Sequence, residues 1–218
     1  MLLRRALSTK VRVRQHVNPL ARRFEAAIPL PEWTKLYPEN ASTVHLDIGC
    51  ARGVYLMELA QQLPQQCFLG VEIREPLVDE ALKRIRENNV CNMHVLHANM
   101  NLHIDPILSS LTTSHEISSV SIFHPDPWMK KRHLKRRLVN PAFAQALATH
   151  LKPSTPVYLQ TDVLELFEYM VEVFSDHAHI FSQDKTPALT NAMGLATDRE
   201  KYVVEHGGAI YRTAFVAK

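Results

Sequence analysis

Five apolar segments of strand length constrain the fold of this chain more than any other feature. They are TVHLDI, CFLGVE, MHVLHA, ISSVSIF and TPVYLQT, at residues 43–48, 67–72, 93–98, 117–123 and 155–161. Segments with helical periodicity follow four of them, at 54–63, 76–87, 103–111 and 163–174. Strands that alternate with helices in this way predict a parallel sheet with helices on both of its faces.

The C-terminal part of the chain follows a different order. The segments HAHIF and AIYRTAFVA, at 177–181 and 209–217, bracket a loop and a short helix, which predicts a final antiparallel strand on the same sheet. We therefore expect an α/β fold, a Rossmann-like, doubly wound and mostly parallel sheet of seven strands. A ligand of such a fold binds where the strands end in loops, at the switch point of the strand order.

The length of the chain and the distribution of its charge indicate one domain with a basic extension. A chain of 218 residues with 46% hydrophobic content can bury one sizeable core and leaves little room for a second. Seven Lys/Arg and no acid occur in residues 1–23, and six Lys/Arg with no acid occur in 130–137. The rest of the chain contains the other 12 basic residues and all 22 acidic ones, so the positive charge is concentrated in the two basic segments. We expect a basic N-terminal arm at 1–25, a single domain at 26–218 and a polyanionic partner such as nucleic acid.

Cysteine and histidine spacing argues against a disulfide framework or a metal site. Cys50, Cys67 and Cys91 lie too far apart for a CxxC pair, which is typical of a protein in a reducing compartment. His94 and His97 have an odd spacing in a strand-like segment, which sends their side chains to opposite faces. No apolar run approaches the length of a membrane span. We expect a cytoplasmic protein without metal or membrane contact, although its Arg-rich start is also compatible with import into an organelle.

The loop after the first strand, LDIGCARG, has the composition of a cofactor-binding turn. Gly49 and Gly53 allow a tight strand-to-helix turn that a cofactor can approach closely. Glu72 ends the second strand, where an acid accepts both hydroxyls of a ribose. The loop lacks the G-x-G-x-x-G order that seats a pyrophosphate, and Asp47 suits an ammonium group better than a phosphate. With Asn99 placed to meet an adenine ring, the pattern favours S-adenosylmethionine over a dinucleotide.

The segment FHPDPWMKKRHLKRRL, residues 123–138, joins one acid to a basic run. Its prolines fix φ at 125 and 127 and bias His124 and Asp126 towards extended conformations. We therefore expect the carboxylate of Asp126 on a stiff turn beside the cofactor cleft. The cations that follow are expected to contact RNA phosphates; they are Lys130, Lys131, Arg132, Lys135, Arg136 and Arg137.

Taken in order, the segments HLDIGCARG, FLGVEIREPLV, HPDPWMKKRHLKRRLVNP, LQTD and TDRE resemble the bacterial-type tRNA (guanine-N7)-methyltransferase family over about residues 12–216. The resemblance implies a class I methyltransferase fold and transfer of a methyl group from S-adenosylmethionine to N7 of a guanosine at position 46, in the tRNA variable loop. Two positions depart from the family pattern. Ala51 replaces a middle glycine, and Arg199 replaces an aromatic residue of the C-terminal tetrapeptide.

The resemblance also implies roles for individual residues. Asp47, Gly49, Gly53, Glu72, Asn99 and Asp126 would form the cofactor site, with Asp126 also beside the reacting base. Lys130, Asp162, Thr197, Asp198, Arg199 and Glu200 would hold the tRNA. A monomer or homodimer without an obligate partner subunit is expected.

The chemistry of guanine N7 suggests why a single acid lies there. N7 has an available lone pair and needs no base to remove a proton, so alignment with the methyl group does most of the work. Methylation leaves positive charge on the purine, which a fixed carboxylate stabilises as it develops. Asp126 is expected to have this role or, more modestly, to bind and orient the base.

Three other classes of function are compatible with parts of the sequence. An amino-group methyltransferase acting on another nucleic-acid base or on protein carries Asn/Asp-Pro-Pro-aromatic at this strand end, whereas Asp126 is followed by only one proline. A dinucleotide-dependent dehydrogenase needs the missing pyrophosphate loop. An RNA-binding domain without catalytic activity does not need the acids Asp47, Glu72 and Asp126.

Overall fold

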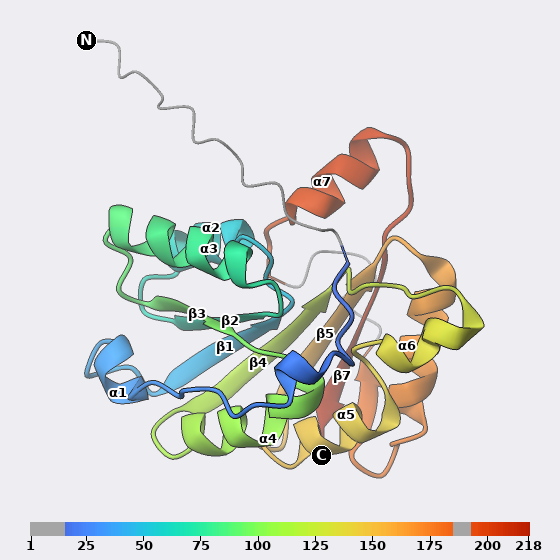
Figure 1. Cartoon of the computed structure of the whole chain (residues 1–218), viewed down its shortest axis with the longest axis horizontal. Helices are drawn as coiled ribbons and strands as arrows, with labels where there is room; N and C mark the ends of the chain where they lie inside the picture. Colours follow the sequence, from blue (N-terminus) through green and yellow to red (C-terminus); the bar gives the residue numbers. More distant parts are fainter. Residues whose placement is uncertain (1–15, 185–192) are drawn as a thin grey trace.

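The computed structural model describes residues 16–184 and 193–218, in which one seven-stranded sheet forms the centre of the molecule (Figure 1). Its strand order is β3-β2-β1-β4-β5-β7-β6. The strands are β1 (Thr43–Ile48), β2 (Cys67–Glu72), β3 (Met93–His97), β4 (Glu116–Phe123), β5 (Pro156–Thr161), β6 (Phe181–Asp184) and β7 (Tyr211–Ala217). Residues 1–15 of the predicted arm lie outside the described part of the chain.

The pairing of the strands confirms the predicted fold class. Strand β1 pairs in parallel with both β2 and β4, and β5 continues the parallel order beside β4. Strand β7 is antiparallel to both of its neighbours, β5 and β6. Strand β6 begins four residues later than the start of HAHIF, because the backbone of His177 accepts hydrogen bonds from Ile180 and Phe181 and closes a turn first.

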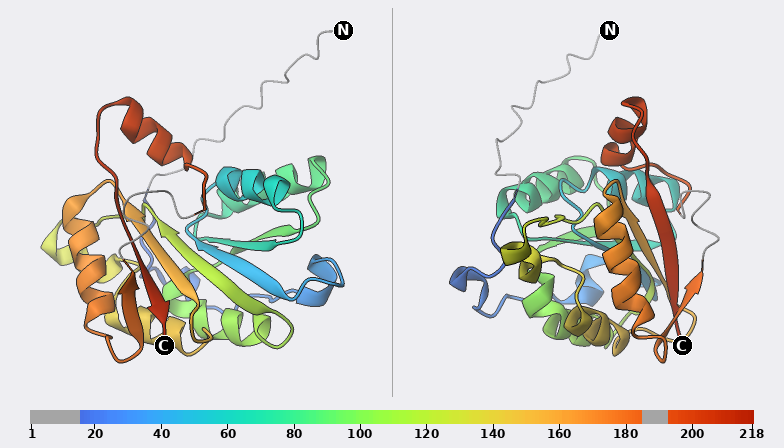
Figure 2. Two further views of the ribbon diagram at one scale, coloured as in Figure 1. Left: turned by 180° about the vertical axis from the view of Figure 1, so that it is seen from behind. Right: turned by 90° about the vertical axis from the view of Figure 1, so that its right-hand side faces the viewer.

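Helices cover both faces of the sheet and build two separate hydrophobic clusters (Figure 2). Helices α2 (Val54–Gln62) and α3 (Glu75–Glu87) pack on one face, whereas α4 (Met100–Leu111), α5 (Pro141–Ala148) and α6 (Leu164–Ser175) pack on the other. In α3 the buried side chains are Leu77, Val78, Ala81 and Ile85, which have the spacing of one helical face. Burying each large aliphatic side chain contributes about 1.5–3 kcal/mol.

Helix α5 was not anticipated from the sequence, although its N-terminus carries a recognisable signal. The side chain of Asn140 accepts a hydrogen bond from the backbone N–H of Phe143 at 3.0 Å, and Pro141 occupies the first turn. An Asn cap followed by proline is typical of a helix start. The segment is short and lies directly after the basic run, so its apolar residues do not form a long periodic pattern.

The described part of the predicted N-terminal arm packs against the domain. Pro19 and Phe24 are buried, and the carbonyl oxygen of Pro19 accepts a hydrogen bond from Asn99 at 2.7 Å. A short 3-10 helix, η1 (Arg22–Phe24), and helix α1 (Trp33–Leu36) precede the sheet. Pro19 and Phe24 therefore attach this segment to the core, although most of its other residues are exposed. None of the described helices is long and apolar enough to cross a membrane.

The cap of α5 provides a test of this packing. Replacing Asn140 by Ala removes the bond from the N–H of Phe143, the bond to the side chain of Asn101 at 2.8 Å and the bond to the carbonyl oxygen of Leu138 at 3.1 Å. We expect the free energy of unfolding in urea to fall by about 1 kcal/mol. Asn40→Ala, at an exposed turn before β1, is the control and should change it by less than about 0.5 kcal/mol. Equal effects of the two substitutions would contradict a capping role.

Candidate functional site

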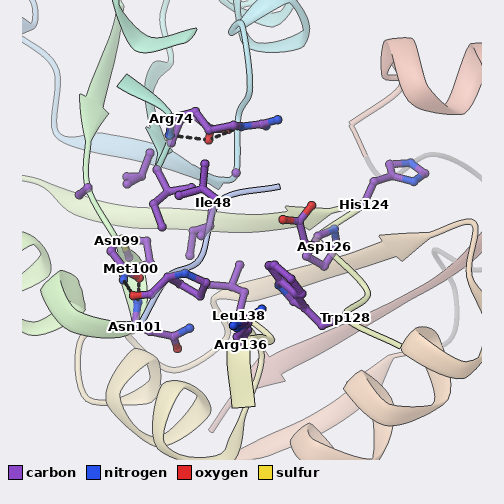
Figure 3. A pocket seen from close by; sticks show the side chains of 18 of the residues that line it. Ile48, Arg74, Asn99, Met100, Asn101, His124, Asp126, Trp128, Arg136 and Leu138 are labelled. Carbon is purple, nitrogen blue, oxygen red and sulfur yellow. Dashed lines mark hydrogen bonds and ion pairs between the residues drawn. The ribbon is translucent and has the colours of Figure 1, made fainter. Parts of the chain in front are cut away.

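A cavity lies where the strand order reverses, between the carboxyl ends of β1 and β4 (Figure 3). The chain leaves β1 towards β2 and leaves β4 towards β5, so the two following loops separate and open a crevice. Four of the residues predicted for the cofactor site line this cavity: Gly49, Glu72, Asn99 and Asp126. They follow four different strands, and only parallel pairing brings these strand ends to the same edge.

Glu72 is the most connected acid of the cavity. Its side chain is 2% exposed, and its carboxylate accepts hydrogen bonds from the backbone N–H of Ala51 at 3.1 Å and of Arg74 at 2.9 Å. The guanidinium of Arg74 pairs with the same carboxylate at 2.9 Å. The carboxylate therefore holds the first loop in place and also faces the cavity, where it can accept hydroxyl donors of a ligand.

The first loop has the geometry that its glycines predict, and Ala51 shares it. The φ angles are 91° at Gly49, 50° at Ala51 and 64° at Gly53, all in the left-handed region. An alanine in this region costs about 1–2 kcal/mol, which the bond to Glu72 helps to offset. At Gly53 a Cβ atom would lie 2.8 Å from the side chain of Met93. Gly53 thus permits close packing of the helix start and does not line the cavity.

Asp47 lies beneath the loop and not on the cavity wall. Its side chain is 5% exposed and accepts a hydrogen bond from Ser121 Oγ at 2.6 Å. Burial, with a smaller contribution from the negative charge of Glu72, raises the pKa of Asp47 to about 7, and the bond from Ser121 opposes this shift. The same hydroxyl lies 3.0 Å from Nε2 of buried His45, which extends the polar chain into the sheet.

Asn99 connects the cavity to the N-terminal segment. It caps α4, where its Oδ1 accepts a hydrogen bond from the N–H of Asn101 at 3.1 Å. Its amide nitrogen donates to the carbonyl oxygen of Pro19, and both Val17 and Pro19 line the cavity. A segment from the start of the chain therefore forms part of the wall.

The turn that carries Asp126 differs from the predicted conformation at one position. His124 has φ 51°, in the left-handed region, so the expectation of an extended His124 is wrong; its ring contacts outweigh the local bias before proline. Asp126 lies on the cavity wall opposite Asn99 (Figure 3), with its side chain 40% exposed and one oxygen 2.8 Å from Nδ1 of His16. Trp128 lies beside it, with the guanidinium of Arg136 5.0 Å from the centre of its ring system.

The predicted tRNA-binding acids belong to a network at the end of β5. Asp162 accepts hydrogen bonds from His124 at 3.0 Å and from Arg199 at 2.5 Å. Thr197 caps helix α7 (Asp198–Glu205) by accepting from the N–H of Glu200 at 3.1 Å. The carboxylate of Glu200 is buried and pairs with Arg212 of β7. The bond between Arg199 and Asp162 thus brings the tetrapeptide beside Asp162, and Asp198 remains exposed within it.

The basic run divides into three environments. Lys130, Lys131, Arg132 and Lys135 are exposed on and beside the 3-10 helix η2 (Lys131–Arg136). Arg136 lines the cavity. Arg137 is 3% exposed; it donates to the carbonyl of Pro127 at 2.9 Å and to Glu165 at 3.2 Å. A phosphate contact by Arg137 therefore does not fit the structure, because its guanidinium is buried and already has partners.

Four side chains have roles in the site that the sequence did not indicate: His16, Arg74, Trp128, and Arg136 as part of the cavity wall. Arg74 follows Glu72 by two residues, a spacing that could have indicated an ion pair at the strand end. The position of His16 depends on chain folding back over 110 residues and has no local signal. Among residues 16–184 and 193–218, no group of three or more His, Cys, Asp or Glu side chains is arranged to hold a metal ion.

Comparison with known proteins first defines a class. A family model described as "Putative methyltransferase" matches residues 41–213. The crystal structure of precorrin-6y C5,15-methyltransferase from Geobacter metallireducens GS-15 covers 81% of this chain and 80% of its own, with a TM-score of 0.52 and 13% identity. The structural match shows the Rossmann-like fold, and the family model shows that the chain is a methyltransferase.

Two relatives narrow this class. A tRNA (guanine-N(7)-)-methyltransferase from Thermosynechococcus vestitus (strain NIES-2133 / IAM M-273 / BP-1) is 44% identical over 94% of this chain and 94% of its own length. One from Synechococcus elongatus (strain ATCC 33912 / PCC 7942 / FACHB-805) is 43% identical over 95% and 97%. The chain belongs to the tRNA (guanine-N(7)-)-methyltransferase family, for which S-adenosylmethionine is the methyl donor.

The burial of Asp47 predicts a specific dependence of stability on pH. The unfolded carboxyl has a pKa of about 3.9, whereas the folded one has a pKa of about 7. Between these values the folded protein binds the extra proton, so this group destabilises the fold progressively as the pH rises and has its full effect above pH 7. We expect Asp47→Asn to leave the free energy of unfolding nearly unchanged at pH 4 and to raise it by up to about 4 kcal/mol at pH 8.

Urea denaturation of both proteins across this pH range measures the difference. Asp79→Asn, at an exposed position of α3, is the matched control and should show no such trend. A difference between wild type and Asp47→Asn that stays constant from pH 4 to 8 would show that Asp47 ionises equally easily in both states.

Proposed function

We propose that this chain transfers the methyl group of S-adenosylmethionine to N7 of a guanosine in the tRNA variable loop, at tRNA position 46. The observation that carries the proposal is the position of Asp126. This residue lines the switch-point cavity, and the exposed cations begin four positions later, at Lys130. A cofactor in the cavity and an RNA on the cations would meet at this residue.

The residues around the cavity are chemically suited to the cofactor. Glu72 offers carboxylate oxygens to ribose hydroxyls, and the amide of Asn99 suits an adenine ring. Gly49 lets the backbone approach the ligand without a side chain in between. Asp47 would attract the ammonium group once it is ionised, and Gly53 supports the loop by its packing. When bound, S-adenosylmethionine supplies an electrophilic methyl group on a sulfonium.

The chain's own part in the reaction is positioning and charge stabilisation. Guanine N7 attacks through its lone pair, so no side chain has to remove a proton first. The purine becomes positively charged, and the carboxylate of Asp126 stabilises this charge because its turn is fixed before the reaction. Trp128 lines the cavity beside it, and an indole ring in this place is suited to stacking on a base.

The tRNA would be held from two sides. Lys130, Lys131, Arg132 and Lys135 are exposed and suited to phosphates, and Arg136 extends this charge into the cavity. Asp162 and Thr197, Asp198 and Arg199 of the tetrapeptide would contact the nucleoside from the side of α7. Glu200, which is buried, would support them through Arg212 and Gln160. We further propose a cytoplasmic enzyme that acts as a monomer or homodimer without an obligate partner subunit. Amino-group methylation of another base or of protein remains the competing activity, and the product separates the two.

Identification of the methylated nucleoside tests the proposal directly. The protein is incubated with labelled S-adenosylmethionine and undermethylated tRNA, and the product is treated with borohydride and then aniline, which cleave RNA at N7-methylguanosine. We expect cleavage within the variable loop. Labelled tRNA that resists this cleavage would contradict N7 chemistry and favour an amino-group methyltransferase.

Replacing Asp126 by Asn tests charge stabilisation, because the substitution keeps the shape of the side chain and removes its charge. We expect the single-turnover rate of methyl transfer to fall by about a hundred- to a thousandfold. The affinity for tRNA, measured by filter binding, should change by less than about tenfold. A rate within a few-fold of wild type would indicate that Asp126 only orients the base through a hydrogen bond.

The exposed cations predict how tRNA affinity depends on salt. Replacing Lys131, Arg132 and Lys135 together by Ala should reduce the slope of log affinity against log salt concentration by about 1 for each phosphate that the protein no longer neutralises. S-adenosylmethionine affinity should stay unchanged. The matched control replaces Lys83, Arg86 and Lys152, three cations that are exposed elsewhere on the surface. If both triple variants alter the slope equally, the basic run is not a specific RNA contact.

A further inference from the structure

His124 lies between the catalytic turn and the elements proposed to hold the tRNA. It is the first residue after β4, two positions before Asp126, and its backbone N–H donates to the carbonyl of Gln160 at 2.7 Å. Its side chain is 10% exposed. Figure 3 shows its ring directed away from the other labelled side chains of the cavity. His124 is among the residues that line the cavity, but its ring nitrogens are directed to Gln160 and Asp162 at the end of β5.

The hydrogen bonds of Gln160 determine which ring nitrogen of His124 carries the proton. Gln160 Oε1 accepts from Arg212 Nε at 2.8 Å, and Gln160 Nε2 donates to Glu200 Oε2 at 3.1 Å. Because a guanidinium can only donate and a carboxylate can only accept, these two partners settle the orientation of the amide. The amide nitrogen then lies 3.0 Å from Nε2 of His124, so Nε2 has to accept.

The other ring nitrogen of His124, Nδ1, then carries the proton. With a lone pair on Nε2, the neutral ring carries its proton on Nδ1, which donates to Asp162 Oδ1 at 3.0 Å. The other oxygen of Asp162 accepts from Arg199. The ring thus links β4, β5, α7 and β7 through hydrogen bonds of fixed direction.

The backbone of His124 depends on this network. A φ of 51° is costly for a non-glycine residue, and a following proline disfavours it further. Both ring nitrogens and the backbone N–H are bonded to β5 or the residue after it, and these contacts hold the conformation. Since Pro125 follows directly, the direction of the chain towards Asp126 is set at this residue.

We propose that His124 is a positioning residue for methyl transfer: as a neutral imidazole donating to Asp162 and accepting from Gln160, it aligns the Asp126 turn with the tRNA-binding side of the site. The inference rests on the proposed function and deepens it. His124 touches neither the methyl donor nor the base in this account, and it acts through Asp126 and Asp162.

Protonation of His124 would oppose this arrangement. A second N–H on Nε2 would face the N–H of Gln160, donor against donor. Burial is the largest influence on the ring and lowers its pKa below the usual range, and the positive charge of Arg199 acts in the same direction. The negative charges of Asp162 and Glu200 oppose this shift, and Arg212 of β7 lies behind Gln160. The active, neutral form therefore predominates at neutral pH and decreases as the pH falls below the usual histidine range.

Two substitutions separate positioning from simple folding. His124→Ala removes both hydrogen bonds of the ring. We expect kcat/KM for tRNA to fall by about a hundredfold, because a small displacement of the reacting groups reduces the rate by about this factor. His124→Asn keeps a donor near the position of Nδ1, tolerates positive φ and does not titrate. We expect it to recover at least about tenfold of the loss at pH 7.5. Both variants should bind S-adenosylmethionine within about twofold of wild type by calorimetry.

The pH profile gives a readout that a merely structural role would not change. The single-turnover rate of wild type should decrease as the pH falls from 7 to 5, and the ratio of His124→Asn to wild type should rise over the same range. His179→Asn, at an exposed turn, is the control and should follow wild type. Parallel pH profiles of wild type and His124→Asn, or full activity of folded His124→Ala, would overturn the proposal. If His124→Ala does not fold, the pH ratio of His124→Asn decides alone.

A different experimental result would contradict the proposed function. If wild type forms a product other than N7-methylguanosine, the reaction class is wrong. The ratio of each variant's single-turnover rate to that of wild type can still be measured on the nucleoside that is formed. This ratio then shows whether His124 positions the site.

Discussion

The parallel pairing of β1 with both β2 and β4 is the constraint on which the rest of the structure depends. Parallel strands end at the same edge of a sheet, so the loops that follow β1, β2, β3 and β4 meet although up to 77 residues separate Gly49 from Asp126. The reversal of strand order between β1 and β4 then separates two of these loops. The cavity is a consequence of backbone hydrogen bonding before any side chain contributes to it.

Several residues at this edge of the sheet have a backbone conformation or a buried acidic group that lowers the stability of the fold, and these residues lie near the cavity. Ala51 and His124 both have φ angles in the left-handed region, and Asp47 is buried with a raised pKa. Each is held by a neighbour of a different element, namely Glu72, Asp162 and Ser121. Strain and buried charge at a site that must fix a cofactor and a base are expected where the surrounding fold determines the geometry.

The charges of the basic run illustrate how folding divides a continuous sequence pattern. Lys131, Arg132 and Lys135 are exposed, Arg136 turns towards the cavity, and Arg137 anchors the segment internally through Pro127 and Glu165. The anchor explains how an exposed cationic segment can have a fixed position. A phosphate contact contributes more to orientation when the residue that makes it is already held by the fold.

The sequence by itself determined the sheet, its mixed direction, the loop after β1 and the acids at the strand ends, because these depend on local periodicity and on residues adjacent to each strand. It also placed the chain in its family through motifs that are continuous in sequence. Only the tertiary structure decided which cations are exposed and that Asp47 lies beneath the loop after β1. It also decided that Pro19 reaches the cavity from the start of the chain and that His16 contacts Asp126. It likewise decided the left-handed conformation and the tautomer of His124. Burial, ion pairing and the direction of a hydrogen bond depend on residues distant in sequence, and no local pattern specifies them.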